Sequence, residues 1–107
     1  MDVSSFVTDL LAALASIEAI DQVALETEGP IVKGRAYLSG KMFLAFYYNQ
    51  ATATQAFALV KDEKRLWGID YDNFRGWHLH PMHNPDQHVV IESLPVSAII
   101  QQLKQLL

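Results

Sequence analysis

Four histidines lie close together near the C-terminal end of the chain. They are the only histidines among 107 residues, and an eleven-residue window holds His78, His80, His83 and His88. Scattered placement would rarely gather them so closely, so the clustering indicates a shared role. His78 and His80 are two residues apart, so in an extended segment both side chains leave the same face.

Polar side chains just before the histidines suggest metal-free catalysis as a first hypothesis. A carboxylate such as that of Asp72 can orient an imidazole, and Arg75 can hold a phosphate through two hydrogen bonds. Imidazoles titrate near neutral pH, so two of them can act as general acid and base on a phosphodiester. This hypothesis needs no cofactor, and its candidate catalytic residues are His78, His80, Asp72, Asn73 and Arg75.

Two other hypotheses compete with catalysis. In the metal hypothesis, His78 and His80 bind a divalent ion such as zinc together with His83, His88 or Asp86. In the structural hypothesis, the histidines are surface groups or a buried hydrogen-bond cluster that stabilises a loop. Without cysteine, a few loop ligands are expected to hold no ion tightly, so protein purified without added metal should carry none.

The tryptophans and Tyr71 are better explained by packing within the protein than by binding of nucleic-acid bases. Trp67 and Tyr71 alternate along one expected strand, which is typical of core or sheet-surface packing rather than base stacking. Trp77, beside the histidines, either covers the site or packs under the loop. The chain has no glycine-rich phosphate loop, nucleophile elbow or EF-hand pattern.

Length and composition predict one soluble domain over residues 1–107. Half the residues are apolar, which supports one core and excludes disordered, collagen-like and coiled-coil chains. The absence of cysteine excludes disulfides, thiol catalysis and thiolate zinc sites. No apolar run approaches the roughly 18 residues of a membrane span, and no basic segment opens a secretory signal. We therefore expect a cytoplasmic protein with no membrane association.

Charge is unevenly distributed along the chain. Residues 1–30 carry six acidic and no basic side chains, whereas residues 31–65 carry six basic and two acidic ones. The basic middle segment could bind RNA, but the net charge of the whole chain is −4. Because dedicated nucleic-acid binders are usually basic overall, solvation or pairing with the acidic first helix is favoured.

The spacing of apolar residues predicts a helix, a meander of strands and a second helix. The first helix begins at Ser4 or Ser5, with Ser4 as its N-cap, and ends near Ile17. From Ile20 to Glu28 the apolar period changes to two, which indicates a strand with one acidic face. Further strands are expected over Ile31–Leu38, Lys41–Tyr48, Thr52–Val60 and Arg65–Tyr71.

The strand over residues 41–48 is apolar on both faces. It should therefore lie centrally under cover on both sides, or contribute to an interface. We expect a homodimer or a complex with a protein partner, with contacts from Phe43, Phe46, Tyr47 or Tyr48. The alternative to an enzyme is therefore a non-catalytic interaction module that dimerises through this face and uses the histidines structurally or for metal.

Residues 74–88 contain glycine, prolines and the histidines, and predict a loop. A short apolar stretch, Val89-Val90-Ile91, follows it. Ser93 should then cap the last helix, with Pro95 in its first turn. The predicted fold is α+β: an antiparallel meander of about five strands, with the N- and C-terminal helices packed on one face.

Residues 31–107 resemble the TumE-type family, small proteins described as toxins of bacterial toxin–antitoxin pairs. The resemblance is specific only over residues 71–80, where Tyr71-Asp72-Asn73 matches a strand end, and Gly76 and His78-Leu79-His80 match the following loop. Asp70 stands where that family has an arginine. The resemblance implies a toxin-like role, RNA as a target and an antitoxin as a protein partner.

Overall fold

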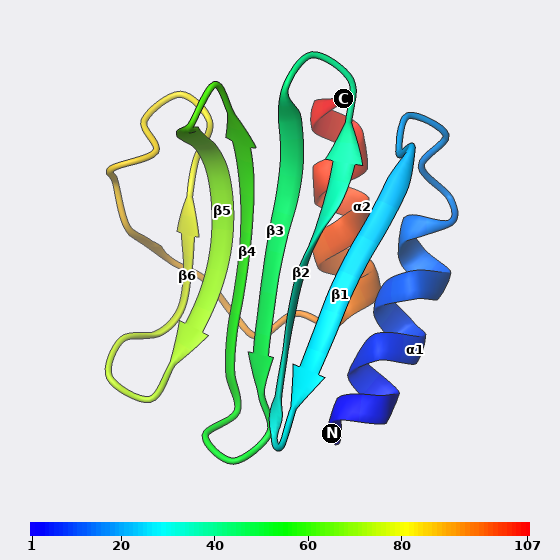
Figure 1. Ribbon diagram of the computed structural model, residues 1–107. Helices are drawn as coiled ribbons and strands as arrows, with labels where there is room; N and C mark the ends of the chain where they lie inside the picture. Colours follow the sequence, from blue (N-terminus) through cyan, green and yellow to red (C-terminus); the bar gives the residue numbers. More distant parts are fainter.

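Seven strands follow one another along the chain and pair in the same order. The computed structural model describes all residues, 1–107, as an α+β fold with one antiparallel sheet and two helices (Figure 1). The elements are α1 (Val3–Leu14), β1 (Gln22–Glu28), β2 (Ile31–Leu38), β3 (Met42–Asn49), β4 (Thr54–Lys61), β5 (Lys64–Asp72), β6 (Gly76–His80), β7 (Val89–Val90) and α2 (Val96–Leu106). The predicted fold class is confirmed, but the sheet has seven strands rather than about five.

Both helices begin at residues other than those expected. Asp2, not Ser4, caps α1, because its side chain accepts a hydrogen bond from the backbone N–H of Ser5. Pro95, not Ser93, stands at the N-cap of α2, where no side chain makes a capping hydrogen bond. Neither helix is long and apolar enough to cross a lipid bilayer.

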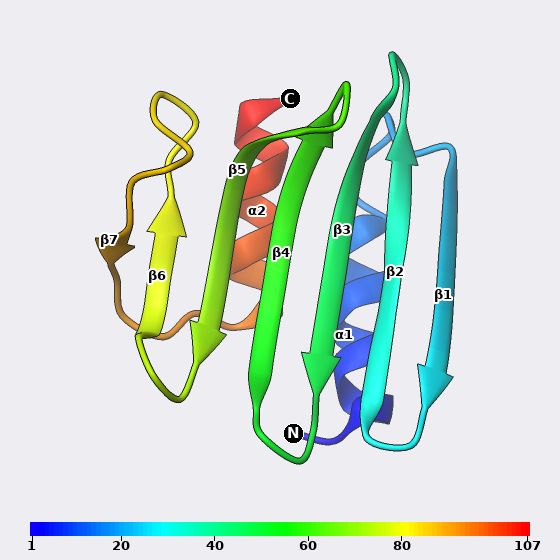
Figure 2. The same cartoon turned by 60° about the vertical axis from the view of Figure 1, so that its left-hand side comes forward.

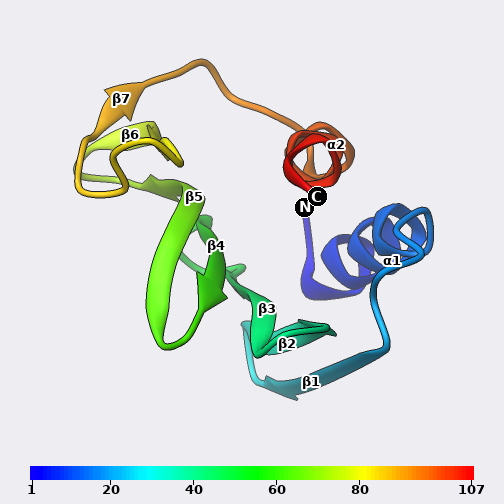
Figure 3. The same cartoon turned by 90° about the horizontal axis from the view of Figure 1, so that it is seen from above.

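The two helices cover one face of the sheet. Figure 2 shows both helices behind the strands, and Figure 3 shows the sheet curving around them. Phe6 of α1 is fully buried in this layer, stacked on Tyr48 with ring centroids 4.8 Å apart. Ile99 and Leu103 of α2 are also fully buried. Alternate strand residues point into this core, and their neighbours point to the opposite face, which we call the open face.

The predicted loop over residues 74–88 is wrong in its first part, because β6 lies there. Trp77 and Leu79 pack against the core, whereas His78 and His80 alternate with them and point to the other face. This alternation is a strand pattern with histidine in the polar positions. The clustered histidines and prolines obscured it, since these residues are typical of loops.

Strand β3 has one covered face and one open face. Phe46 and Tyr48 are buried under the helices, with exposed fractions of 3% and 2%, so neither can contribute to an intermolecular contact. Phe43 and Tyr47 lie on the open face, where the guanidinium of Arg35 sits 4.3 Å from the centre of the Phe43 ring. The expected contact with a second copy or another protein therefore narrows to the part of the open face around Phe43 and Tyr47.

We predict that the part of the open face around Phe43 and Tyr47, away from the histidines, makes the chain a homodimer. Sedimentation should give twice the 12.0 kDa chain mass, and Phe43→Glu should yield monomers because it places a charge in the apolar contact. Thr54→Glu, which adds the same charge at the end of the same face, is the control and should remain dimeric. A wild-type monomer at every concentration would contradict the prediction.

Candidate functional site

A tight turn between β5 and β6 positions the histidines. The Asp72 carboxylate accepts hydrogen bonds from the backbone N–H groups of Phe74 and Arg75, at 2.9 and 2.7 Å. Of these two hydrogen bonds, the one from Arg75 has the larger effect. Together they hold the pKa of Asp72 below its ordinary value. Gly76 then adopts φ +70°, which favours glycine, and the chain returns along β5.

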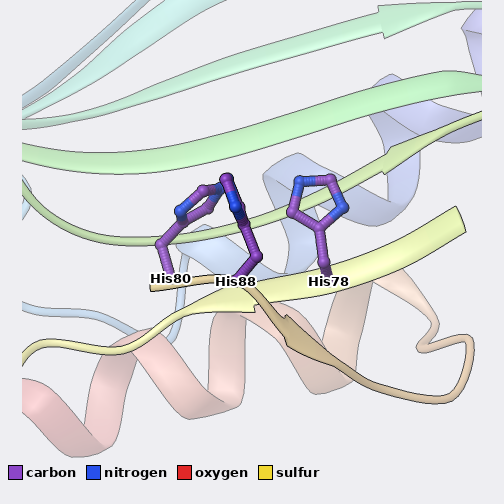
Figure 4. Close-up of side chains that lie close together, drawn as sticks. All are labelled: His78, His80 and His88. Atoms are coloured by element: carbon purple, nitrogen blue, oxygen red, sulfur yellow. The ribbon is translucent and has the colours of Figure 1, made fainter. Parts of the chain in front are cut away.

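The register of this hairpin brings one carboxylate opposite the histidines. Asp70 pairs with His78 across the two strands, and Gly68 pairs with His80. Since directly paired residues share a face, Asp70 and both histidines lie together on the open face. Figure 4 shows the imidazoles on the side of β6 away from α2.

Three of the four histidines form one cluster. His88, just before β7, packs its ring against His78 and His80, with ring centroids 5.5 and 4.6 Å away (Figure 4). One ring nitrogen from each of the three lies within 4.8 Å of the others. His78 and His80 are each 2% exposed, whereas His88 is exposed. The cluster therefore meets solvent through His88.

The Nε2 nitrogen of His78 is buried and has no hydrogen-bond partner. Its Nδ1 lies 3.1 Å from the carbonyl oxygen of Gly76, which can only accept, so Nδ1 carries the proton. Nε2 of a neutral His78 is then a bare lone pair, and it faces Oδ2 of Asp70 at 3.5 Å. A lone pair and a carboxylate oxygen that face each other repel, so this position suits a cation: a proton or a metal ion.

His80 faces the same carboxylate oxygen. Its Nε2 lies 3.2 Å from Oδ2 of Asp70, and its Nδ1 lies 3.0 Å from the carbonyl oxygen of Pro85 and 3.2 Å from Nη2 of Arg65. Burial, followed by the positive charge of Arg65, lowers the pKa of His80. The neutral imidazole, which is the form that binds metals, is therefore favoured.

The two separations between imidazole Nε2 and Asp70 Oδ2 are close to the edges of a zinc coordination shell, whereas the ring nitrogens of the three histidines are more loosely spaced, within 4.8 Å of one another. Zinc binds imidazole nitrogen at about 2.0–2.1 Å and carboxylate oxygen at about 2.0–2.2 Å, so neighbouring ligand atoms of a tetrahedral site lie roughly 3.3–3.5 Å apart. The two imidazole–Oδ2 distances are 3.2 and 3.5 Å. Charge-assisted hydrogen bonds are typically shorter, at about 2.7–2.9 Å.

The other expected site residues have separate roles. Asn73 donates to the carbonyl oxygen of Thr52 and accepts from the Tyr71 hydroxyl, so it fastens the turn. His83 lines a different pocket, beside Trp67 and Leu106, and lies outside the cluster. Trp77 packs toward the core, so it does not cover the site.

Arg75 and Asp72 lie at the edge of the cluster. Arg75 places Nη1 3.4 Å from Nε2 of His88, while its Nε pairs with Asp72 at 3.2 Å. Asp70 and Arg65 were not expected as site residues from the sequence. The strand pairing of Asp70 with His78 was the signal that would have identified the carboxylate.

Models of known protein families, curated proteins and solved structures were compared with the chain, and none of them matches it.

Proposed function

We propose that the protein binds one divalent transition-metal ion, with zinc as the best match, through His78, His80, His88 and Asp70. The observation that carries the proposal is the buried Nε2 of His78, which lacks a partner and faces a carboxylate oxygen. A bound cation would satisfy both atoms, and Nε2 of His80 would complete the same side of the site.

The ligand set favours zinc and its late transition-metal neighbours. Imidazole nitrogens suit zinc, copper, nickel and iron, whereas calcium and magnesium prefer shells made of oxygen. Three imidazoles and one carboxylate also supply the four ligands that zinc usually takes. The Gly76 carbonyl, which accepts from Nδ1 of His78, fixes the ring so that Nε2 points inward.

Burial supports metal binding over metal-free acid–base catalysis. A general acid or base must come within hydrogen-bond reach of its substrate, and His78 and His80 are each only 2% exposed. A phosphodiester in solvent would meet His88 and Arg75 first. The toxin-like action on RNA, implied by the resemblance to the TumE-type family, stays a prediction.

Equilibrium dialysis of tag-free protein against zinc tests the proposal. We expect one zinc ion per chain, and His78→Ala should weaken binding by more than about 100-fold, since even outer-shell partners contribute ~10–100-fold. His83→Ala is the matched control, because His83 lies outside the cluster, and it should bind zinc as the wild type does. Unchanged binding by His78→Ala would overturn the site. No binding by the wild type would overturn the proposal and favour the structural hypothesis.

A further inference from the structure

Two arginines contact the histidine cluster, and their charges matter once a metal is bound. Arg65 reaches His80 at 3.2 Å, and Arg75 reaches His88 at 3.4 Å. Asp70 is the acidic residue that contacts the imidazoles, and Asp72 pairs with Arg75. A dication would leave this group of side chains with a net charge of about +2, at a site that is partly buried and weakly screened. Such a site attracts an anion.

Metal binding would also free Nη1 of Arg75 from its hydrogen bond to His88. In the metal-free protein, Nη1 of Arg75 can donate to Nε2 of His88. If His88 binds the metal through Nε2, that lone pair is used. If it binds through Nδ1, Nε2 carries a proton and becomes a donor. In both cases Arg75 loses its acceptor on His88, while its Nε remains paired with Asp72.

The released guanidinium would lie on the solvent side of the metal. His88 is exposed, whereas His78 and His80 are buried, so a ligand from solvent approaches the metal beside His88 and Arg75. Zinc can accept a fifth ligand. A tetrahedral oxyanion can place one oxygen on the metal and two others on the fork of an arginine.

We infer that the metal-loaded site binds a phosphate group, which bridges the metal and Arg75. The inference rests on the proposed metal site and identifies the ligand class of that site. Phosphate is favoured over a carboxylate because it has enough oxygens to serve the metal and both guanidinium N–H groups together, and it carries more negative charge. Inorganic phosphate is the simplest probe of this chemistry.

Cobalt(II)-loaded protein gives a direct test, because the visible spectrum of cobalt reports its coordination. Titration with inorganic phosphate should change the spectrum to saturation, whereas acetate should require at least about tenfold higher concentration. Arg75→Gln should bind cobalt at least as tightly as the wild type, but should need at least about tenfold more phosphate. Lys104→Gln, which removes an exposed positive charge from α2 on the other side of the sheet, should behave as the wild type.

The outcomes separate this inference from the metal site. Cobalt binding with no response to phosphate, or an unchanged phosphate response in Arg75→Gln, would overturn the inference and leave the metal site intact. An equal response to acetate would overturn the phosphate class. A failure to bind cobalt at all would overturn both proposals.

Discussion

Saturating zinc should raise the midpoint of thermal unfolding by roughly 10 °C. A ligand at 100 times its dissociation constant stabilises the native state by about 2.7 kcal/mol, and each kcal/mol shifts the midpoint by about 4 °C or more in a domain of this size. His78→Ala should remove the shift, because it deletes the buried nitrogen that faces Asp70. Differential scanning calorimetry with and without zinc makes the measurement.

Three controls define this result. His83→Ala should retain the full zinc shift, and a chelator should reverse it. The shift should shrink below about pH 6, because protons compete with the metal for imidazoles. Since the folded chain lowers the pKa of His80, the unfolded chain binds more protons, so acid also destabilises the metal-free protein. The comparison is therefore made at each pH. A zinc shift that survives in His78→Ala would contradict the assignment.

Phe6→Ala should lower the free energy of unfolding by about 3–5 kcal/mol, the usual cost of deleting a buried aromatic ring. Phe6 is fully buried, and it packs on Tyr48 and on Phe57, whose ring centroid is 5.9 Å away. The deletion would leave a cavity between α1 and the sheet. Urea denaturation of both proteins, fitted with the same dependence of the free energy of unfolding on urea concentration, gives the difference in stability.

Leu11→Ala is the matched control on the same helix. Leu11 is 41% exposed, so its truncation should cost only about 0.5 kcal/mol. If Phe6→Ala cost no more than Leu11→Ala, the packing of α1 on the sheet would be wrong.

Periodicity predicted most of the fold, because it depends only on which residues are buried. The strand over Ile31–Leu38 is confirmed at both ends, and the next three lie within a few residues of their expected bounds. The caps were harder to predict, since Asp2 and Ser4 are both good capping residues and differ only in local geometry.

The site was predicted less completely, because strand register decides it. His78 and His80 share a face as their spacing of two predicts, but their common carboxylate is Asp70 rather than Asp72. Once the turn is centred on Phe74, residue 70 must oppose residue 78. That centre depends on how Asp72 hydrogen-bonds the turn, which composition alone does not reveal.

The order of the sheet has a consequence for how the chain reaches its native state. Every strand pairs with its neighbour in sequence, so each hairpin closes a short loop at low entropic cost. The packing of α1 on α2 instead joins the two ends of the chain and encloses the whole meander. Pairing of neighbouring strands is faster than docking of distant segments. The β5–β6 hairpin, which carries Asp70, His78 and His80, can therefore form before the helices pack together. If the proposed metal site is correct, a metal ion present during synthesis would meet three of its four ligands on the paired hairpin before the helices dock.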